Sequence, residues 1–379
     1  MSVDKLQQTL AQKVFHYAKD SKKAAGRALG TLVEIITFYL LKDWGVENNV
    51  RIEKGLIEYR NAAISHNVEY TLHPTVNVIQ LTLAKTLPIT SSKIFLAIQR
   101  LNSLNLQGYI KINSTLLSTA NTVKNSCVIA RNQNKALVAV LIKNNNQSVR
   151  VAVIEQYEKP FAMVECKRVG IEEGNKKGPQ TIEKAKQGAY VARTVSSLQK
   201  VRNYDGTLFG LLPIGQDDFR FDKYDELLKE IISTDNLTIY KDFILTIGVV
   251  SNHGNWFTSD NPNKELVVLR DAYDWLLFLT DNGIATFIDE LLLNPKKEYV
   301  PAQKAFLASY ASDNNSVKKV GKNQFTKTQI NMKADQALQE YFRSNRERIA
   351  KWLNIITPTE VTIDELRKQL TKLSNKKWA

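Results

Sequence analysis

One short segment constrains the fold of this chain more than any other: residues 161–169, which read Phe-Ala-Met-Val-Glu-Cys-Lys-Arg-Val. Its apolar start predicts a buried β-strand, and the run ends in a carboxylate, one spacer residue and a lysine. Side chains alternate between the two faces of a strand, so we expect Glu165 and Lys167 to point to the same side. A carboxylate and an ammonium group at a buried strand end are costly to place, and a site for a divalent metal and a phosphate would explain them.

The neighbouring segments predict a compact motif around this strand. Residues 150–155 read as a preceding strand, Glu158–Pro160 supplies a turn, and the chain returns through 161–165, so we expect a β-hairpin. A polar, glycine-rich loop follows over 170–178, and Pro179 opens a helix with small and apolar residues on one face. The predicted order is hairpin, Glu-x-Lys, loop and helix.

This order resembles the PD-(D/E)xK nuclease superfamily, and most closely its type II restriction endonucleases, over a core near residues 125–255. A second triplet of this kind, Asp20–Lys22, lies in a polar stretch that reads as helix, so only Glu165–Lys167 ends an apolar strand before a helix. The resemblance implies an α/β fold with a mixed-sheet core of the restriction-endonuclease kind, flanked by helices. An ordinary ion pair at a partly exposed strand end is the alternative interpretation.

The resemblance also implies a chemistry for these residues. Phosphodiester hydrolysis needs an activated water and neutralisation of the phosphate, which a divalent metal held by carboxylates provides. Mg²⁺ prefers oxygen ligands from few carboxylates, together with waters and substrate oxygens. Glu165 would then be one metal ligand and the main-chain carbonyl of Cys166 another, while Lys167 would hold the attacking water or the scissile phosphate.

A further acidic residue is implied before the Glu-x-Lys strand, and here the chain departs from the family pattern. In a tight hairpin this acid should lie near residues 148–152, which contain none. Glu155 is the nearest acid upstream of the motif. Some nucleases of this group draw a carboxylate from a helix ahead of the core, and Glu69 is a candidate for that role. We therefore keep Glu69 and Glu155 as candidate catalytic and metal-binding residues, with Glu58 as a further alternative.

The distribution of charge favours a polyanionic partner such as double-stranded DNA. The chain carries a formal net charge of +14, and between Tyr70 and Ile154 it has nine lysines and arginines but no aspartate or glutamate. From Ser316 onward, 14 basic residues stand against six acidic ones. A surface that follows DNA phosphates would explain this asymmetry, although a solvated basic face is the alternative.

Two polar loops carry lysines that are candidate phosphate contacts. One directly follows the Glu-x-Lys strand, and the other leads into the amide-rich and hydroxyl-rich segment Asn323–Asn331, whose side chains are suited to contact base edges. The candidate DNA-binding residues are Lys176, Lys177, Lys318, Lys319, Lys322 and Lys327.

Periodicity divides the chain into three regions. We expect a mainly helical N-terminal region over 1–120, a catalytic core over 121–255, and a mainly helical C-terminal region over 256–379 that is a candidate for DNA recognition. Strands are predicted near 126–131, 136–143, 150–156, 161–169, 207–214 and 243–251. Helices are predicted over 6–27, 28–44, 91–104, 265–280, 284–293, 333–355 and 364–374.

Several other classes of protein are disfavoured. Two cysteines, Cys127 and Cys166, argue against a disulfide framework and agree with a reducing, cytoplasmic setting. No signal peptide is recognisable, and the apolar stretch Thr31–Leu41 is too short, and too interrupted by Glu34, to predict a membrane span. The sequence has no H-E-x-x-H, C-x-x-C or P-loop motif, which disfavours a zinc site and an ATP-driven motor.

The function predicted from the sequence is that of a type II restriction endonuclease. Such an enzyme would cut double-stranded DNA at specific sites with Mg²⁺, as a homodimer in which each site cuts one strand. A repair or recombination nuclease is one alternative. A catalytically inactive DNA-binding protein on the same fold is the other, and the missing acid before the hairpin suggests it.

Overall fold

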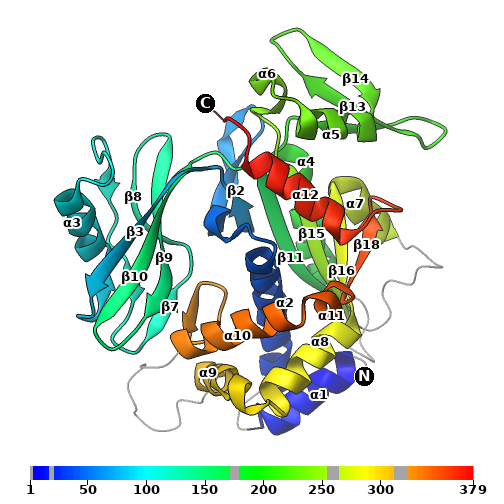
Figure 1. Ribbon diagram of the computed structural model, residues 1–379. Coiled ribbons are helices and arrows are strands. Elements are labelled where there is room, and N and C mark those ends of the chain that lie inside the picture. The colour runs from blue at the N-terminus through cyan, green and yellow to red at the C-terminus, as the bar shows by residue number, and fades with distance from the viewer. Residues whose placement is uncertain (1–2, 17–20, 171–178, 254–263, 311–322, 379) are drawn as a thin grey trace.

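The computed structural model describes residues 3–16, 21–170, 179–253, 264–310 and 323–378. Helices cover both faces of a mixed six-stranded sheet, and a smaller, β-rich unit lies beside that sheet (Figure 1). The chain therefore has an α/β fold, and the predicted fold class, a mixed sheet flanked by helices, is confirmed.

The main sheet combines an antiparallel half with a parallel half. In spatial order its strands are β1 (Val50–Glu58), β2 (Asn61–Leu72), β11 (Ala162–Gly170), β15 (Leu245–His253), β16 (Trp275–Leu279) and β18 (Leu353–Thr357). Strands β1, β2 and β11 pair antiparallel, β11, β15 and β16 run parallel, and β18 is antiparallel to β16. Parallel neighbours need long crossovers, which contain α4 (Pro179–Thr194) between β11 and β15 and α7 (Lys264–Ala272) between β15 and β16.

Each face of the sheet has its own hydrophobic cluster. Val164 of β11 packs in the cluster that contains α2 (Ser21–Asp43), and its neighbour Met163 packs with α4 and α7 on the other face. Helix α2 is apolar on most sides, with Leu32 and Ile36 fully buried, as expected for a helix in the core. The stretch Ala24–Asp43 is long and apolar enough to cross a membrane, but 67% of its most apolar window is buried within the fold.

Residues 75–157 form a separate unit, here called the insert, between β2 and β11. It contains β3 (Thr75–Ala84), β4 (Ile89–Thr90), α3 (Ser91–Leu101), β5 (Ile110–Lys111), β6 (Thr115–Leu117), β7 (Thr122–Lys124), β8 (Cys127–Arg131), β9 (Lys135–Asn144) and β10 (Ser148–Tyr157). Five of its strands form one sheet in the order β3-β10-β9-β8-β5, and β17 (Gln329–Asn331) joins β7, β6 and β4 in another. The insert has its own core, in which Ile94 and Ile98 of α3 pack with Ile129 and Val151.

The remaining elements surround the main sheet. A three-stranded sheet of β12 (Gln199–Arg202), β13 (Leu208–Pro213) and β14 (Phe219–Lys223) packs on α5 (Tyr224–Ser233). The other helices are α1 (Val3–Lys13), α6 (Leu237–Tyr240), α8 (Asp281–Ile288), α9 (Val300–Tyr310), α10 (Met332–Ser344), α11 (Arg346–Ala350) and α12 (Ile363–Ser374). Short helical segments span Glu47–Asn49, Asp289–Leu293 and Lys297–Tyr299.

The predicted hairpin between residues 150–155 and 161–165 is wrong. Strand β10 pairs with β3 and β9 in the insert, whereas β11 pairs with β2 and β15 in the main sheet. The physical reason is that a tight turn joins β9 to β10, while β2 already occupies the antiparallel edge of β11. Proximity along the chain therefore did not decide which strands pair.

Two predictions about the three regions are also wrong: the helical character of the first and the boundary between the second and the third. The region 1–120 is not mainly helical, because β1, β2 and β3 occupy most of 50–84. The boundary at 255 divides the main sheet, since β16 and β18 belong to it. Strand β16 is apolar throughout, as buried parallel strands are, and such a short apolar run cannot be distinguished from a helix by periodicity.

Candidate active site

The alternation of β11 places Glu165 and Lys167 together. Val164 and Cys166 belong to the cluster around α2, so Glu165 and Lys167 lie on the opposite face of the strand. The Glu165 side chain is only 7% exposed, and its Oε1 lies 2.6 Å from Lys167 Nζ. The expectation that these two residues share a side is confirmed.

Strand β2 brings Glu69 beside this pair. Tyr70 is the register partner of Val164, so Glu69 comes next to Glu165. The backbone N–H of Glu69 donates a hydrogen bond of 3.2 Å to Glu165 Oε2, and Glu69 Oε1 lies 3.9 Å from Lys167 Nζ. Glu69 therefore joins the Glu-x-Lys motif, but from a strand of the main sheet and not from a helix ahead of the core.

The other two candidate acids lie elsewhere. Glu155 is in the insert, where its Oε1 accepts a hydrogen bond of 2.7 Å from the Tyr109 hydroxyl and lies 3.3 Å from Lys135 Nζ. Glu58 is at the far end of β1. The structure does not bring Glu155 to Glu165, because the hairpin on which that expectation rested does not form.

Three residues that the sequence prediction did not assign to this site complete it. Lys327 Nζ forms an ion pair with Glu69 and lies 3.2 Å from Glu53 Oε1 and 3.5 Å from Glu34 Oε2. Lys327 is only 7% exposed. Its assignment as a surface contact to DNA is therefore wrong, since its ammonium group is enclosed by carboxylates from α2, β1 and β2.

The sequence contained a signal for one of these residues. Glu34 interrupts an apolar stretch, and a charged residue on a buried helix needs a partner. No comparable signal marks Glu53. In the pairing of β1 with β2, Ile52 is opposite Tyr70 and Lys54 is opposite Val68, so Glu53 lies opposite Glu69. Its φ of 51° is uncommon for a residue other than glycine, and no sequence pattern announces such a local conformation.

Burial sets the electrostatics of the cluster formed by Glu34, Glu53, Glu69, Glu165, Lys167 and Lys327, here called the carboxylate cluster. Burial raises the pKa of Glu165 above its ordinary value, although Lys167 acts to lower it. Burial likewise raises the pKa of Glu34, against the opposing effect of Lys327. Four carboxylates and two ammonium groups leave a formal charge of −2, which one divalent cation would neutralise.

The donor atoms of the cluster fit a hard cation such as Mg²⁺, which prefers carboxylate oxygens. Among the residues that the structure describes, however, no three His, Cys, Asp or Glu side chains are grouped closely enough to hold a metal ion. The ammonium groups of Lys167 and Lys327 instead lie among the carboxylates. The Cys166 thiol is buried on the α2 side, where burial raises its pKa, so only its main-chain carbonyl is suited to the predicted role as a ligand.

Most of the predicted phosphate contacts cannot be placed relative to this cluster. Lys176 and Lys177 lie in 171–178, and Lys318, Lys319 and Lys322 lie in 311–322, all outside the described residues. A basic groove is instead visible on the insert.

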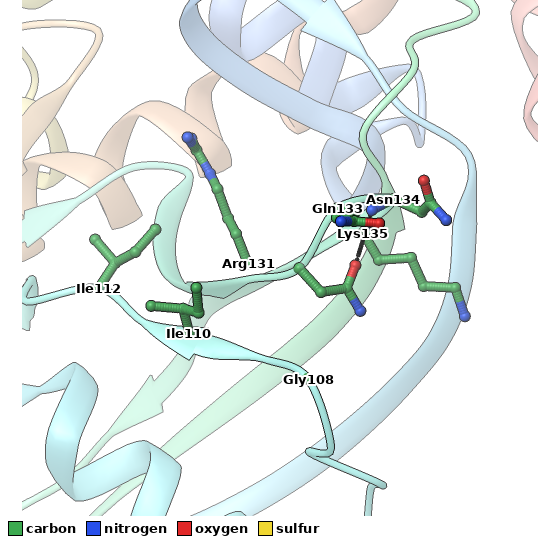
Figure 2. A pocket seen from close by; sticks show the side chains of 8 residues that line it. Gly108, Ile110, Ile112, Arg131, Gln133, Asn134 and Lys135 are labelled. Atoms are coloured by element: carbon green, nitrogen blue, oxygen red, sulfur yellow. Dashed lines mark hydrogen bonds between the residues drawn. The ribbon is translucent and has the colours of Figure 1, made fainter.

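The groove has a volume of about 880 Å³ and is lined by the β5 region and the turn between β8 and β9 (Figure 2). Ile110 is 75% exposed and lies opposite Arg131, and Gln133 and Lys135 line the same groove. None of the described residues that line it is acidic. Amides, cations and apolar side chains together suit contact with both phosphates and base edges.

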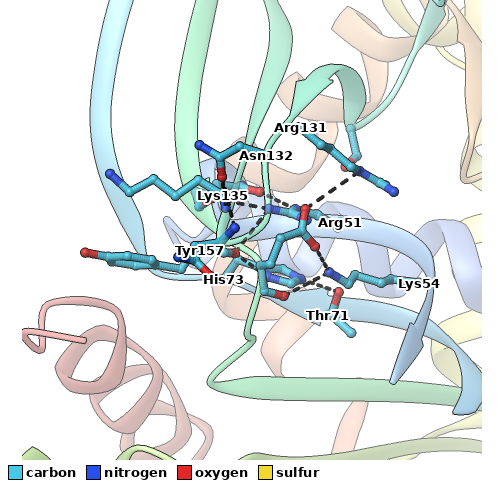
Figure 3. Close-up of polar contacts among 12 residues, drawn as sticks. Arg51, Lys54, Thr71, His73, Arg131, Asn132, Lys135 and Tyr157 are labelled. Atoms are coloured by element: carbon cyan, nitrogen blue, oxygen red, sulfur yellow. Dashed lines mark hydrogen bonds and ion pairs between the residues drawn. The ribbon is translucent and has the colours of Figure 1, made fainter. Parts of the chain in front are cut away.

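A polar joint fixes the insert to β1 (Figure 3). Glu158 Oε1 lies 2.8 Å from Arg51 Nη1 and 3.7 Å from Arg131 Nε, and its other oxygen forms an ion pair with Lys54. Arg51 Nε also donates a hydrogen bond of 2.7 Å to Gln156 Oε1. The joint therefore links the groove on the insert to the strand that carries Glu53.

The chain was compared with protein families, curated proteins and solved structures. No family model matches the chain, and neither a curated protein nor a solved structure matches it.

Proposed function

We propose that this protein is a metal-dependent nuclease that cuts double-stranded DNA, and that it acts as a site-specific endonuclease of the type II restriction kind. Mg²⁺ is the proposed cofactor. A homodimer is the proposed active form, because two sites related by a two-fold axis would cut the two strands of one duplex.

A single observation carries the proposal: Glu165, Lys167 and Glu69 lie together at neighbouring strands of the main sheet. The buried carboxylates supply hard oxygen donors, and the adjacent insert carries an excess of basic side chains. Carboxylates next to a lysine, beside a basic surface, are the groups that hydrolysis of a phosphodiester requires.

Each residue has a distinct proposed role. Glu165 and Glu69 would hold the metal, which when bound neutralises the phosphate and lowers the pKa of a water molecule. Lys167 places a positive charge at the same point, where it holds the attacking water or the scissile phosphate. Glu34 and Glu53 add negative charge around that position. The burial of Glu165 keeps bulk water away from its carboxylate, the proposed metal ligand.

One observation favours the alternative in which the protein binds DNA without cutting it. Lys327 occupies the space between three carboxylates, which closes the cluster in the conformation described. A repair or recombination nuclease has no specific geometric support, and the pattern of cleavage products distinguishes it from the main proposal.

The proposal is tested by incubating the protein with plasmid DNA in Mg²⁺ or in EDTA. Discrete fragments that need Mg²⁺ support a site-specific endonuclease, whereas progressive shortening from ends supports a repair-type nuclease. DNA that stays intact on several plasmids, together with a retained gel shift, supports the binding protein.

The substitution Lys167→Ala tests the site itself. We expect cleavage to fall by at least about 100-fold, because a charge that acts in the chemical step is removed, while binding to DNA without metal changes little. Lys333→Ala is a matched control, since Lys333 is an exposed lysine of α10. Cleavage by Lys167→Ala at the wild-type rate would show that the active site lies elsewhere.

A further inference from the structure

Lys327 has a geometry that the proposed nuclease roles do not explain. Its side chain is nearly inaccessible and reaches carboxylates from three separate elements: Glu34 of α2, Glu53 of β1 and Glu69 of β2. A lysine is rarely buried unless it is paired, and this one is paired with the acids that surround the Glu-x-Lys motif. Its ammonium group is one of the two cations of the cluster, and the one that contacts Glu34, Glu53 and Glu69 together.

The backbone of Lys327 is fastened to the insert. Asn125 donates its side-chain N–H to the Lys327 carbonyl at 2.8 Å and its backbone N–H to the Thr328 carbonyl at 2.9 Å. The next residues form β17, which pairs with β7, and Phe325 is fully buried. The segment 323–331 therefore connects the insert to the carboxylate cluster through one side chain.

We propose that Lys327 is a resident cation of the cluster and that a divalent metal ion takes Glu69 only by displacing it. The identity of the competing ion rests on the proposed function, but the competition itself is a property of Lys327 and its three carboxylates. Lys327 thereby sets how tightly the cluster binds metal, and it couples metal binding to the segment 323–331.

Charge gives the physical reason for competition. Two cations close to one carboxylate repel each other, and this repulsion is strong where burial limits screening by water. Glu69 Oε2 is a buried atom, so it offers little room for both an ammonium group and a metal ion. Glu53 is 59% exposed and lies at the rim of the cluster, which gives the displaced ammonium group a partner outside Glu69.

The first experiment measures Ca²⁺ affinity of the full chain by calorimetry without DNA, so that no catalytic step contributes. Ca²⁺ binds carboxylate oxygens as Mg²⁺ does. We expect Lys327→Met to bind Ca²⁺ at least about tenfold more tightly than wild type, because a competing positive charge is removed. Lys333→Met is the control and should match wild type. Unchanged or weaker affinity in a folded Lys327→Met protein overturns the proposal.

A second measurement uses the wild-type protein, because Lys327→Met leaves three carboxylates without their shared cation and can fail to fold. Hydrogen exchange of the segment 323–331 is compared with and without Ca²⁺. Faster exchange with Ca²⁺ is expected if Lys327 leaves the cluster, and unchanged exchange at saturating Ca²⁺ overturns the proposal.

The two proposals fail in different ways. If wild type cuts DNA with Mg²⁺ but neither Ca²⁺ measurement shows displacement of Lys327, only the competition is refuted and the nuclease remains. If neither wild type nor Lys327→Met binds Ca²⁺ or Mg²⁺, the competition and the metal-dependent nuclease are both refuted.

Discussion

His73 shows how closely the joint between the main sheet and the insert is packed. It is fully buried, and its Nδ1 lies 2.9 Å from the Tyr157 carbonyl, which can only accept, so Nδ1 donates. Its Nε2 then accepts from the Thr71 hydroxyl at 2.7 Å. Burial, with a smaller effect from Arg51 and Lys54, lowers the pKa of His73 well below its ordinary 6.5. The folded protein therefore holds this imidazole neutral.

This neutral imidazole predicts a dependence of stability on pH. Below about pH 6.5 the unfolded chain binds a proton at His73 that the folded protein does not, so stability is complete above that pH and is lost as pH falls. The loss can reach about 1.4 kcal/mol per pH unit. We expect the free energy of unfolding in urea to fall more for wild type than for His73→Gln between pH 7.5 and 5.5. An identical fall in both proteins contradicts the prediction.

At the same scale, the sequence identified only those site residues that a local pattern marks. Strand alternation was enough to pair Glu165 with Lys167, and the family pattern directed attention to Glu69. Lys327 was placed in the wrong environment, because its position follows from pairing between β17 and β7, which are about 200 residues apart in the chain. No spacing within a short window can report such a contact.

Among the elements, the approach of α4 to β11 depends on one glycine. A Cβ built at Gly188 would lie 2.6 Å from the Tyr273 hydroxyl oxygen and 3.0 Å from Glu165 Cγ. Tyr273 is almost fully buried and has little freedom to move away. The absence of a side chain at Gly188 therefore lets α4 pack directly against β11 and helps fix the position of the Glu165 carboxylate.

Gly188→Ala should disturb both the packing of α4 on β11 and the position of the Glu165 carboxylate. Alanine is normally the better helix former by about 1 kcal/mol, but the contacts with Tyr273 and Glu165 oppose that gain, and overpacking typically costs about 1–3 kcal/mol. We expect a net loss of stability in urea unfolding and weaker Ca²⁺ binding by calorimetry. Gly30→Ala in α2 is the matched control, because a Cβ there meets no atom within 4 Å.

The control should be as stable as wild type or more stable, by up to about 1 kcal/mol. If Gly188→Ala behaves like Gly30→Ala in both measurements, then Glu165 is not positioned by the close approach of α4.

Element types were easier to predict than element partners. The strands near 126–169 and the helix that begins at Pro179 were identified, because their apolar runs and breakers are strong local signals. The long polar hairpin of β1 and β2 was missed, since much of it faces solvent and it lacks a continuous apolar pattern. An insertion of more than 80 residues separates β2 from β11 in the chain, yet these two strands pair in the main sheet. Local sequence patterns do not reveal a pairing over such a distance.

For the whole molecule, charge and architecture coincide. The stretch without aspartate or glutamate, from Tyr70 to Ile154, covers almost the entire insert, so a sequence observation maps onto one structural unit (Figure 1). The carboxylate cluster, by contrast, lies at the main sheet. The molecule therefore separates a cationic surface from an anionic site, as a protein that holds DNA beside a metal-dependent centre would require.

This separation predicts that the insert supplies phosphate contacts. Lys111 is an exposed lysine of β5, the edge strand of the five-stranded sheet of the insert. We expect Lys111→Glu to weaken binding of a duplex in EDTA by about threefold to tenfold at 50 mM salt, and to flatten the slope of log Kd against log salt by about one. Fluorescence anisotropy across 50–200 mM salt measures both. Lys229→Glu, at an exposed lysine of α5 outside the insert, should leave both unchanged. Wild-type affinity and slope for Lys111→Glu would place the DNA on another face of the molecule.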